Sequence, residues 1–336
     1  MKAVILNSFG GVENFLMSTV ERPTVKRNHI LVRIIATSFN PVDYQIRKGS
    51  EESKLLKSAV LRRELSGVVE VVGSEVKDYS KGDEVVAYVG SFGSNGTYAE
   101  YVSIPSDLAA RKPGIMRFEE AAGIPMVGLT ALQIFERMNF SKDDMIFISG
   151  AAGGVGTMII KLLLSEGHAR IITIAGSKES HMHLYSLGLR QDQVINYREA
   201  GWEEKVIELN EGNLYDITID LVGGSISEFC ASVLRVHGIY CDITCLATAK
   251  ARQILFDRGI TIMNISNYAH ALSGVSWTPD YYGSKLKFLL GLIEKGIITA
   301  PPVEIIGKLG VETVRRGHTM LEHNLAGGKK LIMHND

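Results

Sequence analysis

A glycine-rich stretch carries the clearest chemical signal in the sequence, Gly150-Ala-Ala-Gly-Gly-Val-Gly156. The apolar run Met145–Ile148 before it is typical of a buried strand, and Met158–Leu164 after it is typical of a helix packed on a sheet. A backbone without side chains can approach a pyrophosphate closely, and a helix N-terminus offers free N–H groups. An ordinary tight turn is the alternative. In this context we predict a dinucleotide site that includes Gly153, Gly154, Val155 and Gly156.

A second polar cluster follows about twenty residues later, where NAD-binding folds carry an acid for the ribose 2′-hydroxyl. The sequence has no acid at the strand end and reads Gly176-Ser177-Lys178. A small residue, a hydroxyl and an ammonium suit a 2′-phosphate instead. We therefore predict NADPH as the cofactor, with these three residues at the phosphate. A solvated charge at a helix start is the alternative for Lys178, and Glu179 suits a helix N-terminus.

The elements that must position these residues change pattern along the chain. Residues 1–120 hold short runs rich in Val, Ile and Tyr, divided by turn residues, which predicts a mainly β domain. From 121 to 266 strands alternate with helices, which predicts an α/β fold with a doubly wound parallel sheet. The segment 267–336 could return to the first domain and complete it. The six strands expected in the middle segment are Met145–Ile148, Ile171–Ala175, Gln193–Asn196, Ile217–Val222, Ile239–Thr244 and Ile260–Ile265.

Composition excludes several classes of function. The 336 residues are 46% hydrophobic and 22% charged, with a net charge of −1, so no basic excess points to nucleic acid. No apolar run approaches the roughly 18 residues of a membrane helix. Three irregularly spaced cysteines indicate a reducing compartment. We expect a cytoplasmic protein whose partner is a small-molecule substrate, with neither nucleic acid nor membrane.

Potential metal ligands are sparse. Residues 1–120 contain one histidine and no cysteine, whereas catalytic zinc needs three protein ligands. His181 and His183 are two apart and would not share a helix face, so a solvated helix is the better interpretation. Cys241 and Cys245 would share a strand face, where buried thiols are commoner than ligands. No metal site is predicted.

Eight stretches, in this order, carry a resemblance to a known family: Asn40–Gly49, Leu65–Gly73, Lys81–Val85, Gly96–Val102, Gly128–Ala131, Gly150–Gly156, Asp220–Gly224 and Gly328-Lys329. The chain resembles the medium-chain dehydrogenase/reductase superfamily, in its zinc-independent quinone oxidoreductase-like branch. The family implies a GroES-like β-rich N-terminal domain plus a Rossmann domain that binds NADPH. Many members are homodimers or tetramers built on Rossmann-sheet edges, which would place 260–267 at an interface. We expect a homodimer.

The resemblance also implies roles for four further residues. Asn40 could donate its amide N–H to a substrate carbonyl, although it could instead cap the helix expected from Pro41. Tyr44 could lie over the substrate or give it a proton, or could simply pack in the core. Thr130 matches a position near the nicotinamide, and its alternative is inward packing on a helix. Tyr197 matches a position that contacts the 2′-phosphate.

Two departures from the family pattern affect the substrate pocket. The segment Leu61–Ser66 stands where the family usually shows a proline and a glycine–aspartate pair, with Glu64 in place of the aspartate. Gln45 stands where many quinone reductases carry a tyrosine. Asp43 and Arg47 lie four residues apart on the expected helix, so they could form a local ion pair.

The residues and the resemblance together predict an enzyme, an NADPH-dependent reductase of quinones or α,β-unsaturated carbonyls that transfers hydride without a metal. An enoyl-thioester reductase of the same superfamily is one alternative. A non-catalytic NADPH-binding protein is another.

Overall fold

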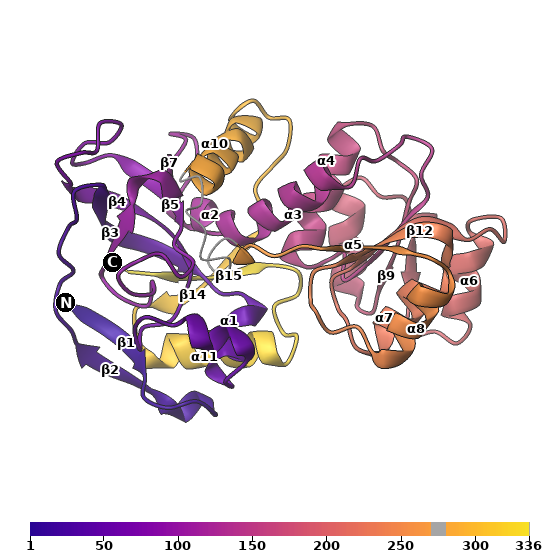
Figure 1. The fold of residues 1–336 in the computed structure, drawn as a ribbon, viewed down its shortest axis with the longest axis horizontal. Helices are drawn as coiled ribbons and strands as arrows, with labels where there is room; N and C mark the ends of the chain where they lie inside the picture. Colours follow the sequence, from indigo (N-terminus) through magenta and orange to yellow (C-terminus); the bar gives the residue numbers. More distant parts are fainter. Residues whose placement is uncertain (270–279, 336) are drawn as a thin grey trace. The chain divides into compact units, whose positions relative to one another are not determined.

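The computed structural model describes residues 1–269 and 280–335, and it divides into two compact units (Figure 1). Unit 1 combines Met1–Leu129 with Asn267–Asp336, and unit 2 is Thr130–Ser266. Unit 1 is therefore discontinuous in sequence, whereas unit 2 is one uninterrupted stretch.

Unit 1 is built on a mainly antiparallel sheet whose strand order is β14-β15-β3-β4-β5-β7, with β6 paired to β3. β1 and β2 form a separate two-stranded ribbon, and its Ala3 makes an isolated bridge with Ala99, two residues before β6. The strands are β1 (Lys2–Leu6), β2 (Phe15–Thr19), β3 (His29–Ser38), β4 (Glu64–Val72), β5 (Glu84–Tyr88), β6 (Tyr101–Pro105), β7 (Ala109–Arg111), β14 (Val303–Lys308) and β15 (Lys330–His334). The helices are α1 (Pro41–Arg47), α2 (Phe118–Ala122), α10 (Asp280–Glu294) and α11 (Val311–Glu322), with α3 (Pro125–Arg137) at the boundary of the units.

Strand β15 returns to β3 late in the chain and places its first residue near the start of α1. Ile332 pairs with Ser38, and Met333 with Thr37, in antiparallel register. Lys330 therefore reaches Asn40, which follows directly after β3. A contact between residues so far apart in sequence depends on this pairing, because β-strands present side chains at fixed register positions.

Unit 2 is a six-stranded parallel sheet in the order β10-β9-β8-β11-β12-β13. Numbered along the chain this is 3-2-1-4-5-6, the doubly wound nucleotide-binding order. All six expected strands are present as β8 (Ile146–Ser149), β9 (Ile171–Ala175), β10 (Val194–Asn196), β11 (Tyr215–Asp220), β12 (Leu234–Asp242) and β13 (Thr261–Asn264). The helices between them are α4 (Gly154–Ser165), α5 (Lys178–Ser186), α6 (Trp202–Glu208), α7 (Ser225–Ser232) and α8 (Ala249–Asp257).

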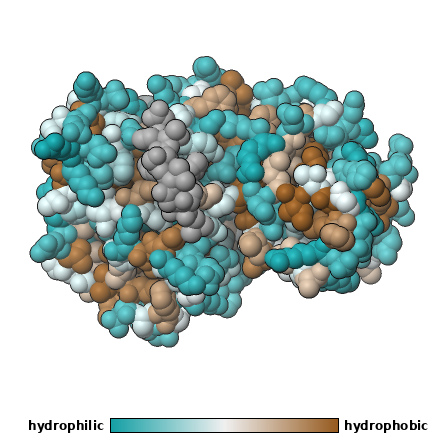
Figure 2. Space-filling model, viewed as in Figure 1, coloured by the Kyte–Doolittle hydropathy of each residue, from teal (hydrophilic) through white to brown (hydrophobic). Residues whose placement is uncertain are grey.

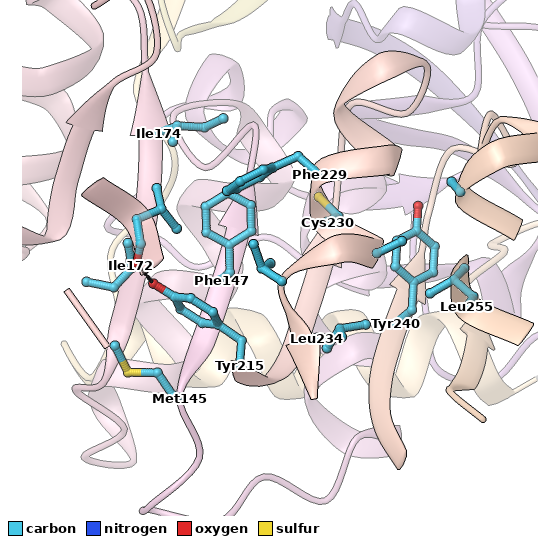
Figure 3. Packing of buried hydrophobic residues seen from close by; sticks show 14 of the residues in the cluster. Met145, Phe147, Ile172, Ile174, Tyr215, Phe229, Cys230, Leu234, Tyr240 and Leu255 are labelled. Atoms are coloured by element: carbon cyan, nitrogen blue, oxygen red, sulfur yellow. Dashed lines mark hydrogen bonds between the residues drawn. The ribbon is translucent and has the colours of Figure 1, made fainter. Parts of the chain in front are cut away.

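Aromatic side chains fill the core on one side of this sheet (Figure 3). The Phe147 ring on β8 lies 5.8 Å from Tyr215 and 5.4 Å from Phe229, both edge-on. The Tyr215 hydroxyl donates to the carbonyl of Val206, so this ring buries its apolar body with its polar end satisfied. The core holds the strand ends rigid where the glycine loop begins.

Hydrophilic residues dominate the face of the molecule shown in Figure 2, with smaller hydrophobic patches between them. The most exposed large apolar side chain in the described ranges is Phe256, at 82%. Among the helices of the described residues, none has both the length and the apolar character needed to span a membrane.

Candidate functional site

The glycine loop joins β8 to α4 with the geometry that a pyrophosphate requires. Gly150 has a φ of +65°, a conformation that favours glycine, and Gly153 is the N-cap of α4. A Cβ on Gly156 would overlap the backbone of Ala151, so only glycine permits this close turn. Gly153, Gly154 and Val155 are accessible at the helix N-terminus, whose free N–H groups favour an anion. The loop therefore fits a dinucleotide.

The end of strand β9 brings Gly176 and Tyr197 together. A Cβ on Gly176 would collide with the phenol ring of Tyr197, which follows β10 and is 43% exposed. The hydroxyl of Ser177 accepts a 3.1 Å hydrogen bond from the backbone N–H of Ser180 and so caps α5. Lys178 follows on the first turn, exposed and without an ion pair to any described residue. An exposed ammonium, a hydroxyl and a phenol thus follow or border the glycine at the strand end, and the nearest carboxylate in the sequence, that of Glu179 on the first turn of α5, interacts with the Ser177 side chain.

A buried carboxylate organises the neighbouring loop and was not singled out as a site residue from the sequence. Asp220, at the end of β11, accepts bonds from the hydroxyls of Ser149 (2.8 Å) and Tyr240 (2.6 Å). It also accepts from the backbone N–H groups of Val222 and Gly223. These donors fix the loop whose Val222 side chain lies against Gly150. Asp220 therefore shapes the glycine loop from its neighbouring strand; the stretch Asp220–Gly224 was the only sequence signal.

Asn40 stands at the N-cap position of α1, but its side chain makes no capping bond. Its Nδ2 donates to Glu64 at 2.6 Å, and its Oδ1 accepts from Lys330. Because lysine only donates and a carboxylate only accepts, these two neighbours fix the orientation of the amide. One amide hydrogen remains for another acceptor. The capping bond comes instead from Asp43, whose carboxylate accepts from the backbone N–H of Asn40 at 2.7 Å.

Glu64 is the centre of a fully buried charge cluster, made of Asn40, Asp43, Arg62, Glu64 and Lys330. Its carboxylate accepts from Arg62 at 2.7 Å, from the backbone N–H of Met126 at 2.5 Å, and from Ser38. Burial alone would raise the pKa of Glu64, but Lys330, Arg62 and these hydrogen bonds outweigh it and lower the pKa to about 2. Glu64 is therefore a fixed anion. Burial lowers the pKa of Lys330, with the attraction of Glu64 opposing that shift.

Arg62 explains the departure in Leu61–Ser66. It has a φ of +96°, in a region that favours glycine. Its guanidinium bridges the carboxylates of Asp43 and Glu64, and its side chain is fully buried. The expected Asp43–Arg47 ion pair was wrong: Asp43 pairs with Arg62, and Arg47 pairs with Glu322 on α11. Each of these two residues pairs with a partner more distant in sequence than the four-residue spacing predicted. A sequence pattern cannot reveal such partners.

The other two sequence-derived site residues lie on helices α1 and α3. Tyr44 is half-buried on α1, with the ammonium of Lys48 5.9 Å from its ring centroid. Thr130 is 7% exposed on α3, at the start of unit 2. Their roles remain predictions, as do those of the other site residues.

By resemblance to zinc-dependent relatives, Asn40 and Leu61–Ser66 stand where those enzymes carry zinc ligands, and this segment has no Cys or His. Arg63 and Glu64 stand in the segment after β3 and α1, and Glu64 is already committed to two cations. Within 1–269 and 280–335, no three His, Cys, Asp or Glu side chains cluster as metal ligands. Since the donors do not fit, no step of the proposed reaction runs through a metal.

The remaining candidate ligands are partly as expected. Cys241 is buried as predicted, but Cys245 is exposed because β12 ends at Asp242, so the expectation of two buried thiols on one strand face was wrong for Cys245. His183 contacts the Thr157 hydroxyl at 2.8 Å and His181 contacts Tyr185. Both histidines are half-buried on α5 rather than simply solvated.

The 3-2-1-4-5-6 sheet with its glycine loop, together with an antiparallel β unit, defines a nucleotide-binding dehydrogenase fold. The family description "Alcohol dehydrogenase GroES-like domain" matches residues 26–114, and "Zinc-binding dehydrogenase" matches residues 154–273. The chain belongs to the medium-chain dehydrogenase/reductase superfamily, in its quinone oxidoreductase-like branch. The GroES-like and Rossmann assignments are thereby confirmed.

Relatives and solved structures are similar over the whole chain. An NADPH-dependent alkenal/one oxidoreductase, chloroplastic, of Arabidopsis thaliana is 30% identical, covering 99% of this chain and 79% of the relative. A 2-methylene-furan-3-one reductase of Solanum lycopersicum is 32% identical over the same shares. The quinone oxidoreductase of Coxiella burnetii has a TM-score of 0.82 at 27% identity, covering 100% of this chain and 99% of that one.

Proposed function

We propose that this protein is an NADPH-dependent reductase of quinones or α,β-unsaturated carbonyls. The observation that carries the proposal is the end of strand β9, where Gly176 packs under Tyr197 and the exposed Lys178 follows, without an acid. This arrangement favours a 2′-phosphate over a 2′-hydroxyl. The printed activities of the relatives from Arabidopsis thaliana and Solanum lycopersicum support the substrate class.

Unit 2 holds the cofactor in this proposal. Gly153, Gly154, Val155 and Gly156 would receive the pyrophosphate at the N-terminus of α4, and Lys178 and Tyr197 the 2′-phosphate. Ser177 keeps α5 capped, which holds Lys178 on the first turn. Thr130 would lie near the nicotinamide. NADPH, when bound, supplies a hydride equivalent to the substrate.

Unit 1 supplies the residues that meet the substrate. Asn40 would offer its second amide hydrogen to the substrate carbonyl, because the first is held by Glu64. A quinone or enone spreads incoming charge through its conjugated system, so a neutral donor suffices. Tyr44, half-buried with the Lys48 ammonium 5.9 Å from its ring centroid, would give the proton or hold the substrate in place.

A substrate panel tests this function. The purified protein is mixed with NADPH and, in turn, quinones, enals, enones, enoyl-thioesters and simple alcohols, and the loss of NADPH absorbance is followed. Turnover of quinones or enones with NADPH, unaffected by EDTA, supports the proposal. Best turnover of enoyl-thioesters would favour the alternative reductase, and tight NADPH binding without any turnover would favour a non-catalytic role.

The finer assignments of assembly and location also belong to the proposal. Strand β13 ends the parallel sheet, and Thr261, Ile262 and Asn264 are exposed along it. An open edge with apolar exposure is a surface for pairing with a second copy, and we propose a homodimer through it.

The three free cysteines support a cytoplasmic location.

A further inference from the structure

Unit 1 contains a small polar cavity next to the buried charge cluster. Its volume is about 30 Å³, and Gly90 and Gly96 are among the residues that line it. Three cations, Lys57, Arg62 and Arg63, line it against one carboxylate, that of Asp43. A cavity of this size holds about two waters or one small polar group. Glu64 pairs with Arg62 and Glu52 pairs with Arg63, so the charges around the cavity balance, and the case for a ligand rests on unmatched donors.

Two of these cations have hydrogen-bond donors without a partner among the described residues. They are Nε of Arg62 and Nη1 of Arg63, on side chains that are 0% and 4% exposed. A guanidinium stays charged at all relevant pH, and its buried donors are costly when unmatched. The donors of Arg62 are otherwise committed to Asp43, Glu64 and Ser38. Arg63 is therefore the cation with more capacity for a ligand.

Arg63 is held rigidly. Its carbonyl accepts from the backbone N–H groups of Val89 (2.6 Å) and Gly90 (3.1 Å). Its Nη2 lies 3.2 Å from Glu52, and its guanidinium carbon lies 5.8 Å from the centroid of the Tyr268 ring. Burial raises the pKa of Glu52, and the charge of Arg63 opposes that shift. The Tyr88 hydroxyl also interacts with this guanidinium, so Nη1 is the position at which a ligand oxygen can bind.

We propose that Arg63, supported by Arg62, binds a carboxylate group of the substrate, so that the preferred substrates are enones or quinones that carry an acid. A carboxylate matches the planar guanidinium fork and fits the cavity. Asp43 does not oppose it, because its own charge is paired with Arg62. The identification of the ligand as a substrate rests on the proposed reductase function; the carboxylate site itself does not.

A matched pair of substrates tests this. (E)-4-Oxo-2-pentenoate and its methyl ester contain the same enone and differ only in the carboxylate. We expect the wild-type protein to prefer the acid in kcat/KM by about tenfold to hundredfold, the strength of one charged hydrogen-bonded contact. Arg63→Leu should abolish the preference through a higher KM for the acid. Arg63→Lys, which keeps the charge but not the fork, should reduce it at least fivefold and replaces Arg63→Leu if that variant does not fold.

Arg27→Leu is the control, because it removes an exposed arginine of unit 1 that does not line the cavity, and it should retain the preference. A wild-type protein that prefers the ester, or an Arg63→Leu variant that loses acid and ester activity equally, would overturn the proposal. If neither compound is turned over, the substrate panel decides the reductase function, and binding tests the carboxylate site. In calorimetry on the NADPH complex, 4-oxopentanoate should bind at least tenfold more tightly than its methyl ester, and only with Arg63 present. Equal binding overturns the proposal.

Discussion

At the scale of single residues, Arg62 combines a strained backbone with a paired charge. Its φ of +96° costs about 1–3 kcal/mol for a residue with a Cβ. The ion pairs of the guanidinium with the buried carboxylates of Asp43 and Glu64 offset this cost. Removing one partner of a buried ion pair costs about 3–5 kcal/mol. The charge term therefore exceeds the strain.

Two substitutions separate these terms. Arg62→Ala and Arg62→Gly both remove the guanidinium, so both should lower the free energy of unfolding by several kcal/mol. Only glycine relieves the backbone, so Arg62→Gly should be more stable than Arg62→Ala by about 1–3 kcal/mol. Urea unfolding of both variants measures the difference. Equal stabilities would show that the backbone at this position is unstrained.

Lys178 tests the choice of cofactor. It is exposed, has no ion pair among the described residues, and stands on the first turn of α5. Lys178→Ala should weaken NADPH binding by about tenfold to hundredfold and leave NADH nearly unchanged, because only NADPH carries the 2′-phosphate. Fluorescence titration with each cofactor gives the two dissociation constants. Lys205→Ala removes an exposed lysine elsewhere in unit 2 as the control, and equal losses for both cofactors would make Lys178 merely structural.

At the scale of secondary-structure elements, local patterns predicted the Rossmann unit well. Its six strands and its glycine loop follow from apolar runs and turns that are contiguous in sequence. The charge cluster could not be predicted in this way, because it joins Asn40, Glu64 and Lys330 through the β3–β15 pairing. The same limit produced the wrong Asp43–Arg47 pair. Residue spacing reports neighbours on one element, not which strand returns beside it.

The open edge of β13 allows a test of assembly. Ile262 is 48% exposed on this strand, so Ile262→Lys would bury a charge in any interface formed there. We expect the variant to shift a dimer toward monomer by at least tenfold in dissociation constant, measured by analytical ultracentrifugation. Ile297→Lys, at a 50% exposed isoleucine of unit 1, should not change assembly. An unchanged dimer in the Ile262 variant would place the interface elsewhere.

At the scale of the whole molecule, acid should destabilise the protein in two steps. His318 is buried beside Arg47 and Arg62, and burial lowers its pKa well below the ordinary 6.5. Below about pH 6.5 this histidine is therefore protonated in the unfolded chain but stays neutral in the folded chain. The free energy of unfolding then falls by up to about 1.4 kcal/mol per pH unit. Glu64 adds a second loss below its ordinary 4.5, down to its folded pKa of about 2.

His318→Gln should reduce the loss of unfolding free energy between pH 7 and 5. Glutamine can still bond the Tyr98 hydroxyl, which lies 3.0 Å from Nε2, but it does not titrate. Unfolding free energies between pH 7 and 5 should then vary less than in the wild type. His323→Gln, at an exposed histidine on the same helix end, should keep the wild-type slope. A parallel fall in both variants would assign the acid sensitivity to other groups.

Because unit 1 is discontinuous, it can be completed during synthesis only after unit 2 has left the ribosome. Residues 1–129 emerge first, yet β15 and the ammonium of Lys330 emerge only after the whole of unit 2. Until then Glu64 lacks one of its two cations, and the end of β3 at Ala36–Ser38 lacks its β15 partner. A nascent chain stalled after Lys295 should therefore show unit 2 already resistant to protease and residues 1–129 still open to cleavage. The segment made first would be the one that matures last, and during that interval it would be the part that depends on chaperones.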